Sequence, residues 1–463
     1  MLFNSFQFLW FLPISIVVYY LLNPKWRWAF LLGISYYFYM CWRPEYVVLI
    51  LASTVLDYWV ARKMSELSNQ KVRKKYLYMS LVGNLGMLFT FKYFDFFMYN
   101  TEVLMGKLNI FYDSPILNVL LPMGISFYTF QTLSYTIDVY KGKTTAEKHL
   151  GYFALYVTYF PQLVAGPIER ASRLLPQLKK TTLPSRDDVQ YGINKILLGF
   201  FKKVVVADNI AVFCDQLFAN PVNASGLLYA IAITLFIFQL FADFSGYSDI
   251  AIGTARLMGV RLMENFNRPF WSSNISEFWS KWHISLTSWI GDYIFKPMVK
   301  NWPKAAQFLS IFVMVLIGFW HGASWNFVTF GLLHGVIIFL QRHYKKIAWL
   351  KGFSKRPYII NLYRIWNVVL LIITGVFFRN SFGNSVKIFK HIVSDFSLSL
   401  GQLRSPFQTE MMISIFVCLL LLVTVVFNEK LKFKHQNLYT LFMLLVIIFL
   451  GLDNQNQFIY FQF

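Results

Sequence analysis

Charged residues make up only 14% of this 463-residue sequence, whereas 57% of the residues are hydrophobic, and the mean hydropathy is +0.48. This shortage of charge excludes an ordinary soluble globular protein and predicts an integral membrane protein. Because each membrane span takes roughly 20 residues, the chain has room for on the order of 11 to 13 apolar segments. We expect short loops between them and no sizeable soluble domain.

Cysteine is scarce, and the familiar motifs of soluble enzymes are missing. The three cysteines, Cys41, Cys214 and Cys418, are far apart and show no CxxC spacing, which argues against a disulfide framework and a zinc site. The sequence contains no HExxH, Walker loop or nucleophile elbow, and no GxGxxG opens a plausible site, so zinc hydrolases and nucleotide-driven pumps are disfavoured. We therefore expect no bound metal and no bound cofactor.

Acidic residues are few, 22 against 43 basic ones, which gives a formal net charge of +21. Such a charge could indicate nucleic acid binding, but the basic residues cluster between apolar runs, as in 62–75 and 345–356. This clustering is typical of loops on the cytoplasmic side of a membrane. We expect membrane lipids rather than nucleic acid as partners. The first ten residues hold no Lys or Arg and no cleavage pattern, so the first span should remain in the mature protein.

Long apolar runs predict the membrane-embedded helices. They occur near residues 6–22, 26–42, 46–61, 76–99, 193–215, 226–244, 305–320, 325–341, 363–378, 409–427 and 437–452. A shorter run, 151–166, is broken by Pro161, which predicts a re-entrant segment surrounded by protein. The aromatic stretch 458–463 is expected to anchor at the membrane interface.

The stretch from Ser245 to Pro303 is too polar to span a membrane and too aromatic for an ordinary loop. We expect it to lie at the interface or to dip inward. Within it, Trp282, Leu286, Trp289 and Tyr293 recur with helical spacing, which predicts one amphipathic helix.

His321 stands between two apolar runs, in the sequence Trp320-His321-Gly322-Ala323-Ser324. Ionisable groups are costly within membranes, so such a residue usually faces a cavity or a partner and is a functional candidate. The small residues that follow would allow a substrate to approach the ring. The alternative is that His321 caps a helix end and bonds a backbone carbonyl, and local features do not decide between the two.

Other polar and aromatic patches are candidates for the same site. They hold Tyr128 and Gln131; Glu169 and Arg170; Asp243, Ser245, Tyr247 and Asp249; and Asn265, Trp282, His283 and Ser285. Each has a structural alternative: hydroxyls bond their own helix carbonyls, Glu169 and Arg170 form an interfacial pair, Asp249 caps a helix, and His283 is a satisfied core histidine. The two carboxylates of the third patch lack the further ligands that a divalent ion needs.

Taken in order, these patches resemble the membrane-bound O-acyltransferase family, and within it the bacterial branch of the alginate O-acetyltransferase membrane subunit. The matching segments are Leu121–Gln131 with Asp138–Tyr140, Tyr159–Arg170, Asp243–Ala251, Glu264–Phe270, Glu277–Tyr293, and Trp320–Trp325 with Gly331–Gly335. The resemblance is weak beyond about residue 345.

The resemblance implies a single all-α domain over 1–463, with about 11–13 transmembrane or re-entrant helices in a ring around a central tunnel. The catalytic core would be about 116–341, and the peripheral helices would be 1–115 and 342–463. It also implies a multi-pass protein of the bacterial inner membrane that moves an acyl group, in this branch acetyl, from a cytoplasmic thioester donor to hydroxyls of an extracytoplasmic polysaccharide. Acetyl-CoA or an acyl-carrier thioester would be the donor. An extracytoplasmic esterase-like partner of the SGNH type would receive the group.

By the same resemblance, His321 and His283 are the catalytic candidates. Neutral imidazole is the side chain best matched to general-base work near neutral pH. The candidates for lining the substrate tunnel are Tyr128, Gln131, Asp243, Ser245, Tyr247, Asp249, Asn265, Trp282, Ser285, Trp320 and Ser324. Two alternatives stay open: the D-alanyl transfer branch of the same family, which modifies teichoic acids, and a polytopic transporter.

Overall fold

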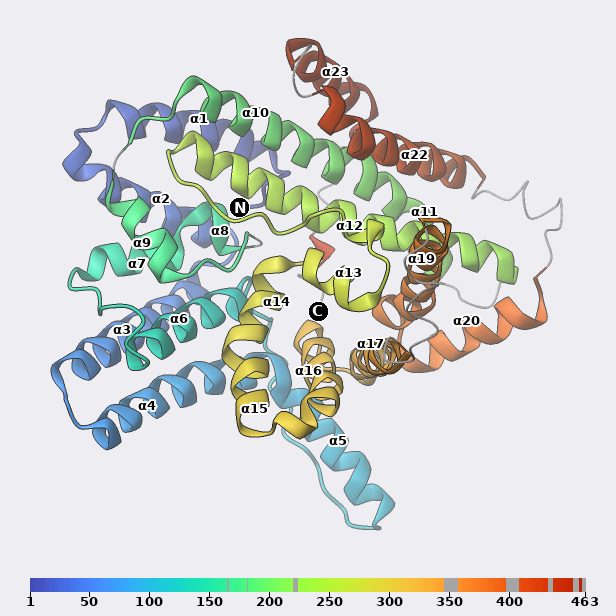
Figure 1. Ribbon diagram of the computed structural model, residues 1–463, viewed down its shortest axis with the longest axis horizontal. Helices are drawn as coiled ribbons and strands as arrows, with labels where there is room; N and C mark the ends of the chain where they lie inside the picture. The colour runs from blue at the N-terminus through green and yellow to red at the C-terminus, as the bar shows by residue number, and fades with distance from the viewer. Residues whose placement is uncertain are drawn as a thin grey trace. The chain divides into compact units, whose positions relative to one another are not determined.

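A computed structural model describes residues 1–164, 166–180, 182–219, 224–344, 357–396, 408–431, 436–452 and 458–459. Every regular element among these residues is a helix (Figure 1). Four of the described helices are long and apolar enough to cross a membrane: Pro44–Glu66, Gly226–Leu257, Pro303–His321 and Tyr358–Arg379. The prediction of an all-α polytopic membrane protein is confirmed, whereas the ring, the tunnel and the single domain stay predictions.

The chain divides into two compact units, each made of two stretches of sequence. The first unit holds Met1–Ile196 with Ile250–Glu264, and the second holds Leu197–Asp249 with Asn265–Phe463. The helices of the first unit are α1 (Phe6–Leu21), α2 (Arg27–Met40), α3 (Val47–Glu66), α4 (Gln70–Leu88), α5 (Phe94–Lys107), α6 (Ile125–Tyr140), α7 (Leu150–Thr158), α8 (Phe160–Leu163), α9 (Ala171–Lys179) and most of α10 (Arg186–Phe200). Short 3-10 turns cover Pro24–Trp26 and Pro44–Tyr46, and a π-helical turn, Phe89–Tyr93, joins α4 to α5.

Within the first unit, α3, α4 and α6 pack around a buried carboxylate, that of Asp57. Ser80 donates a hydrogen bond to it, as do Asn84 Nδ2 at 2.8 Å and Thr136 Oγ1 at 2.9 Å. A buried polar group is tolerated only when it is hydrogen-bonded, and here all three helices contribute. The polar residues of these apolar helices therefore hold the helices together.

The second unit is built from long helices that flank a short, broken helical region (Figure 1). Its helices are α11 (Asp208–Ala219), most of α12 (Gly226–Leu257), α13 (Ile275–Lys281), α14 (Ile284–Ile290), α15 (Lys296–Asn301), α16 (Ala306–His321), α17 (Trp325–Tyr344), α19 (Pro357–Arg379), α20 (Phe382–Ser394), α22 (Gln408–Leu431) and α23 (Gln436–Leu450). π-helical turns cover Phe201–Ala207 and Gly291–Phe295, and 3-10 turns cover Pro269–Trp271 and Pro303–Ala305.

Glycines let α16 and α17 pack backbone to backbone. A Cβ atom on Gly318 would lie 2.2 Å from the carbonyl oxygen of Phe327, and one on Gly331 would lie 2.3 Å from that of Met314. Small residues at helix interfaces permit such close approach in membranes. The hairpin of α16 and α17 thereby fixes the end of α16, where His321 stands.

The span predicted for 226–244 is too short, because α12 continues to Leu257. Its polar residues are accommodated inside the protein. Lys202 Nζ lies 2.6 Å from Asp249 Oδ2, and a Cβ on Gly246 would lie only 2.8 Å from the carbonyl oxygen of Gly199. The helix continues through this polar stretch because Lys202 pairs with Asp249 and because Gly246 lets the neighbouring backbone pack closely.

The amphipathic helix predicted over 282–293 is present from Ile284 onward, where α14 continues through the π-helical turn Gly291–Phe295 into α15, but it does not include Trp282. α13 ends at Lys281, and α14 begins only at Ile284. Between them His283 has φ +46°, in the left-handed region. The backbone of residues 265–267 bonds both sides of this break, because Asn267 N donates to Lys281 O at 3.0 Å and Ile284 N donates to Asn265 O at 2.9 Å. Periodicity along the sequence does not reveal such a tertiary contact.

Two other predictions concern irregular segments. The helix of the 151–166 run is interrupted at Tyr159, between α7 and α8, which confirms a broken helix there. The interfacial anchor predicted for 458–463 is wrong for Phe458 and Ile459, because their side chains are 0% and 4% exposed. Residues 460–463 lie outside the described part of the chain.

Candidate active site

The end of α16 places His321 beside an apolar pocket. The helix stops here because Gly322 adopts an extended conformation, and His321 is 3% exposed. Its ring packs against aromatic neighbours, with ring centroids 5.0 Å from Trp320 and 5.0 Å from Phe378. The side chain is therefore held between aromatic rings. Its surroundings bear on the two alternatives for His321, a residue that faces a cavity or one that caps a helix end.

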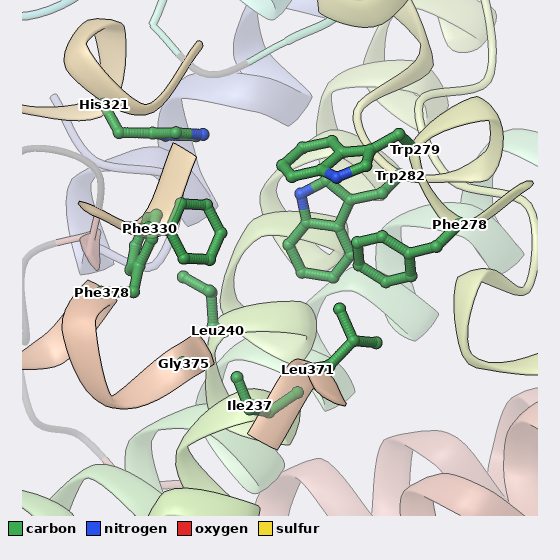
Figure 2. Close-up of a pocket in the computed structure, with 10 residues that line it drawn as sticks. All are labelled: Ile237, Leu240, Phe278, Trp279, Trp282, His321, Phe330, Leu371, Gly375 and Phe378. Carbon is green, nitrogen blue, oxygen red and sulfur yellow. The ribbon is translucent and has the colours of Figure 1, made fainter. Parts of the chain in front are cut away.

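The pocket beside His321 belongs entirely to the second unit. It is lined by Ile237, Leu240, Phe278, Trp279, Trp282, His321, Phe330, Leu371, Gly375 and Phe378. Figure 2 shows the imidazole reaching from one wall toward the indoles of Trp279 and Trp282. Among these residues His321 alone carries an imidazole. The structure thus places one basic ring nitrogen at the wall of an otherwise apolar pocket.

The cavity is small, with a volume of about 30 Å³. A single water molecule needs roughly 10–15 Å³ on this measure, so the cavity has room for on the order of two or three heavy atoms. Its walls are also fixed, because Trp279 Nε1 donates to His334 Nδ1 at 3.1 Å, and His334 Nε2 lies 2.9 Å from Thr374 Oγ1. The volume is therefore on the scale of a small group such as acetyl rather than of a long acyl chain.

His283 occupies a different environment, which is polar and fully buried. Asn265 Oδ1 lies 3.1 Å from His283 Nδ1 and accepts from Ser285 N at 3.2 Å and Ser285 Oγ at 2.9 Å. Asn265 Nδ2 donates to Ser248 Oγ at 3.2 Å, which sets the orientation of the amide. Because Oδ1 is an acceptor, Nδ1 of His283 carries the proton, and Nε2 is the basic nitrogen.

The backbone and burial of His283 both indicate a constrained residue. A non-glycine residue at positive φ is uncommon and often marks a functional site. Burial lowers the pKa of His283 to about 3, so its ring stays neutral at physiological pH. Along the sequence, His283 lies between the membrane-spanning helices Gly226–Leu257 and Pro303–His321 and belongs to neither.

Trp320 connects the two histidines. The ring centroid of Trp320 lies 5.0 Å from that of His321 and 5.9 Å from that of His283. The sequence separates the histidines by 38 positions and could not show this proximity. The structure brings His283, Trp320, His321 and Trp282 into one region, although only His321 and Trp282 of these line the pocket.

The acidic candidates form buried ion pairs. Asp249 lies within α12 and pairs with Lys202, so the prediction that it caps a helix is wrong. Asp243 Oδ1 lies 2.8 Å from Lys203 Nζ, which also contacts Asp208 Oδ1 at 2.9 Å. No group of three or more His, Cys, Asp or Glu side chains with metal-binding geometry occurs in the described part of the chain.

The remaining candidates of the second unit lie away from the pocket lining. Ser245 and Tyr247 are 1% exposed, and the ring of Tyr247 lies 4.5 Å from that of Phe458. Ser324 donates to Asn326 Oδ1 at the start of α17, next to His321 in sequence. Their predicted role in lining a tunnel stays a prediction.

Tyr128 and Gln131 belong to the first unit, on α6. Both side chains are buried, and Gln131 Nε2 donates to the carbonyl oxygen of Tyr156. Glu169 lies in the same unit, and its carboxyl feels the charge of the adjacent Arg170, the expected pair partner, as well as that of Arg173. It is 0% exposed, contacts Arg173 Nη1 at 3.4 Å and accepts from Met263 N. Burial raises the pKa of the Glu169 carboxyl, against the opposing effect of Arg173.

Sequence reasoning missed several pocket residues that come from helices far along the chain. Phe330 on α17 and Leu371, Gly375 and Phe378 on α19 all line the pocket. Each lies in an apolar run, so only tertiary packing distinguishes it from a lipid-facing residue. The apolar run 363–378 predicts α19 itself but not which of its residues face the pocket.

Comparison with known proteins identifies a family and several similar proteins for this chain. The family model described as the membrane-bound O-acyltransferase family matches residues 45–381. A probable alginate O-acetylase of Pseudomonas syringae pv. tomato is 38% identical over 389 residues, 82% of this chain and 72% of that protein. A peptidoglycan O-acetyltransferase of Helicobacter pylori is 32% identical over 438 residues, 87% of this chain and 82% of that protein. A teichoic acid D-alanyltransferase of Bacillus subtilis is 33% identical over 251 residues, 50% of this chain and 63% of that protein.

Proposed function

The chain belongs to the membrane-bound O-acyltransferase family and is a multi-pass membrane O-acyltransferase, and we propose that it transfers acetyl from a cytoplasmic thioester toward a polysaccharide outside the inner membrane. Family membership overturns the transporter alternative, because the matched relatives are named as group-transfer enzymes. The observation that carries the proposal is the imidazole of His321 at the wall of a small apolar pocket.

The proposed step is attack of a hydroxyl oxygen on the thioester carbonyl carbon. The carbon–oxygen bond forms and the carbon–sulfur bond breaks, while the hydroxyl proton passes to His321 and from there to the departing thiolate. General-base assistance of this kind contributes roughly 100- to 10,000-fold. The apolar rings around His321 exclude water, which strengthens every polar interaction with the reacting atoms.

The pocket favours acetyl over the D-alanyl group of the alternative branch. A D-alanyl ester carries an ammonium group, and a buried cation requires a paired partner. None of the ten lining residues is Asp or Glu. The methyl of an acetyl group, by contrast, gains from transfer into apolar surroundings. We therefore rank D-alanyl transfer second, supported by the similarity to the Bacillus subtilis relative.

The donor, the acceptor and the partner complete the proposal. Acetyl-CoA or an acyl-carrier thioester is the donor, and the acceptor is an alginate-like or peptidoglycan-like glycan, by analogy with the named relatives. We propose that an extracytoplasmic SGNH-type protein passes the acetyl group on. Asn265 and His283 would hold Trp320, and through it the ring of His321, in place.

The test is the chemistry of the cell surface after deletion of this chain. Surface polysaccharide is treated with mild base, and the released acetate and D-alanine are measured in the parent strain, the deletion strain and strains complemented with the parent chain or His321→Ala. We expect acetate to fall and to return only with the parent chain. Loss of D-alanine with unchanged acetate would favour the second candidate, and no change in either would overturn both.

A further inference from the structure

The segment Phe458–Ile459 reaches the interior of the second unit, far along the chain from the site. Both side chains are buried, at 0% and 4% exposure. The segment lies outside residues 45–381, which the family model matches. The contacts of the two residues show which part of the second unit they hold in place.

A buried ion cluster binds the backbone of this segment. Lys203 Nζ lies 2.9 Å from Asp208 Oδ1 and 2.8 Å from Asp243 Oδ1. The other carboxylate oxygen of Asp243 accepts a hydrogen bond from Ile459 N at 2.7 Å. Buried charges are stable only when paired and hydrogen-bonded, so the cluster requires this N–H as one of its donors. The contact joins residues 216 positions apart.

From this anchor, a chain of aromatic contacts leads to His283. The Phe458 ring lies 4.5 Å from the Tyr247 ring and 5.5 Å from the Phe244 ring. The Phe244 ring in turn meets His283 edge to face, with centroids 4.6 Å apart and an interplanar angle of 89°. Asp243, Phe244 and Tyr247 all lie on α12. The segment thus packs on the same turn of α12 that contacts the histidine.

We propose that Phe458 and Ile459 are positioning residues, which hold Phe244 against His283 and so fix the orientation of the imidazole. Asn265 holds the ring through Nδ1, and Phe244 packs against it with the two ring planes nearly perpendicular. Without Phe458, Phe244 gains the vacated space, and the His283 ring gains freedom to rotate. The consequence for acyl transfer rests on the function proposed above, whereas the restraint on His283 does not.

The contacts that hold α23 in place indicate that Phe458 and Ile459 are not needed for the general folding of the unit. Leu452 N donates to Val204 O at 3.0 Å, and Asn209 Nδ2 donates to Leu450 O at 3.1 Å. These contacts seat the end of α23 without Phe458 or Ile459. Substitutions in the segment should therefore loosen the surroundings of His283 and leave the rest of the unit intact.

The experiment is chemical footprinting with diethyl pyrocarbonate, which modifies neutral imidazole, followed by mass spectrometry of the full-length protein in detergent. Phe458→Ala removes the ring, and Ile459→Pro removes the N–H that Asp243 accepts. Phe458→Leu keeps apolar volume, and Ile459→Val keeps the N–H, so these two are the matched controls. His334 is equally buried, at 0% exposure, and serves as the internal standard.

We expect modification of His283 to rise about tenfold or more in Phe458→Ala and Ile459→Pro, with His334 unchanged and both controls near the parent. Equal protection of His283 in all variants would overturn the proposal, as would a parallel rise at His334, which would show general loosening. In the transfer assay we expect kcat to fall on the order of 10- to 100-fold with little change in KM. If the parent chain transfers no acyl group, the proposed function fails while footprinting still decides the positioning role.

Discussion

His321 and His283 belong to one unit and both contact Trp320, yet their surroundings differ. His321 faces an apolar pocket with room for a few atoms. His283 is enclosed by Asn265, Ser285 and Phe244 and adopts a left-handed backbone conformation. A ring that must react needs access to substrate, whereas a ring that must hold position needs fixed partners. This difference is the reason why we propose the chemical step for His321 and the supporting role for His283.

The largest expected effect comes from His321. Replacement by Gln keeps much of the shape and removes the base, so we expect kcat to fall roughly 100-fold or more. The measurement is transfer of radiolabelled acetyl in membrane vesicles. His343→Gln, at the exposed end of α17, is the control and should keep parent activity. Full activity in His321→Gln would contradict the role of His321 as the base. An equal loss in His343→Gln would show that the loss is not specific to His321.

The second effect tests whether His283 depends on Asn265. In Asn265→Leu, the ring and Ser285 lose their shared acceptor, and a buried donor left unsatisfied costs about 1–3 kcal/mol. We expect kcat to fall about tenfold, with KM for the donor nearly unchanged. Asn265→Asp keeps an oxygen in place and should retain more activity than Asn265→Leu. The same activity in both variants would show that the acceptor oxygen does not matter.

The third effect concerns the size of the His321 pocket. In Gly375→Ala the new methyl would lie 2.3 Å from Ile237 Cδ1, so Ile237 must move toward the cavity or the helices must separate. One methylene in an apolar pocket is worth on the order of tenfold in selectivity. We expect the ratio of propionyl to acetyl transfer to fall about tenfold, measured by competition between the two donors. Ile237→Val should relieve the contact and restore the ratio.

The smallest expected effect is the pH dependence that His283 gives to the stability of the protein. Its folded pKa of about 3 lies below the ordinary value of 6.5, so below pH 6.5 the unfolded chain binds a proton that the folded chain does not. Stability from this residue is therefore lost as the pH falls, by about 1.4 kcal/mol per pH unit. The Tm of the parent protein in detergent should fall more between pH 6.5 and 5 than that of His283→Gln. Parallel curves would contradict the buried neutral ring.

Much of this arrangement could be predicted from the sequence, and the exceptions have physical causes. The apolar runs predict the long helices well, because burial in lipid imposes a single strong pattern. The apolar run 226–244 predicts an end of α12 that is too early. The helix continues because Lys202, outside α12, forms an ion pair with Asp249. The break at His283 escapes periodicity because it depends on the distant backbone of Asn265.

The site shows the same limit. His321 stands out as an ionisable residue between apolar runs, and Asn265 and Trp282 appear beside His283 as polar and aromatic neighbours. Gly375 could not be identified, because it lies in an ordinary apolar run, and the aromatic stretch 458–463 predicts an interfacial anchor rather than the buried position that Phe458 has. What makes them part of the site is contact between helices, which a single sequence does not record.

The most direct test of the central claim is a single-turnover comparison of His321→Gln and His283→Gln in vesicles that contain the rest of the pathway. Radiolabelled acetyl donor is added, and label in base-labile polysaccharide esters is followed with time. The account predicts that His321→Gln falls to roughly a hundredth of the parent rate or below, while His283→Gln keeps a clearly higher rate. The reverse order, or parent-level transfer without the His321 imidazole, would contradict it.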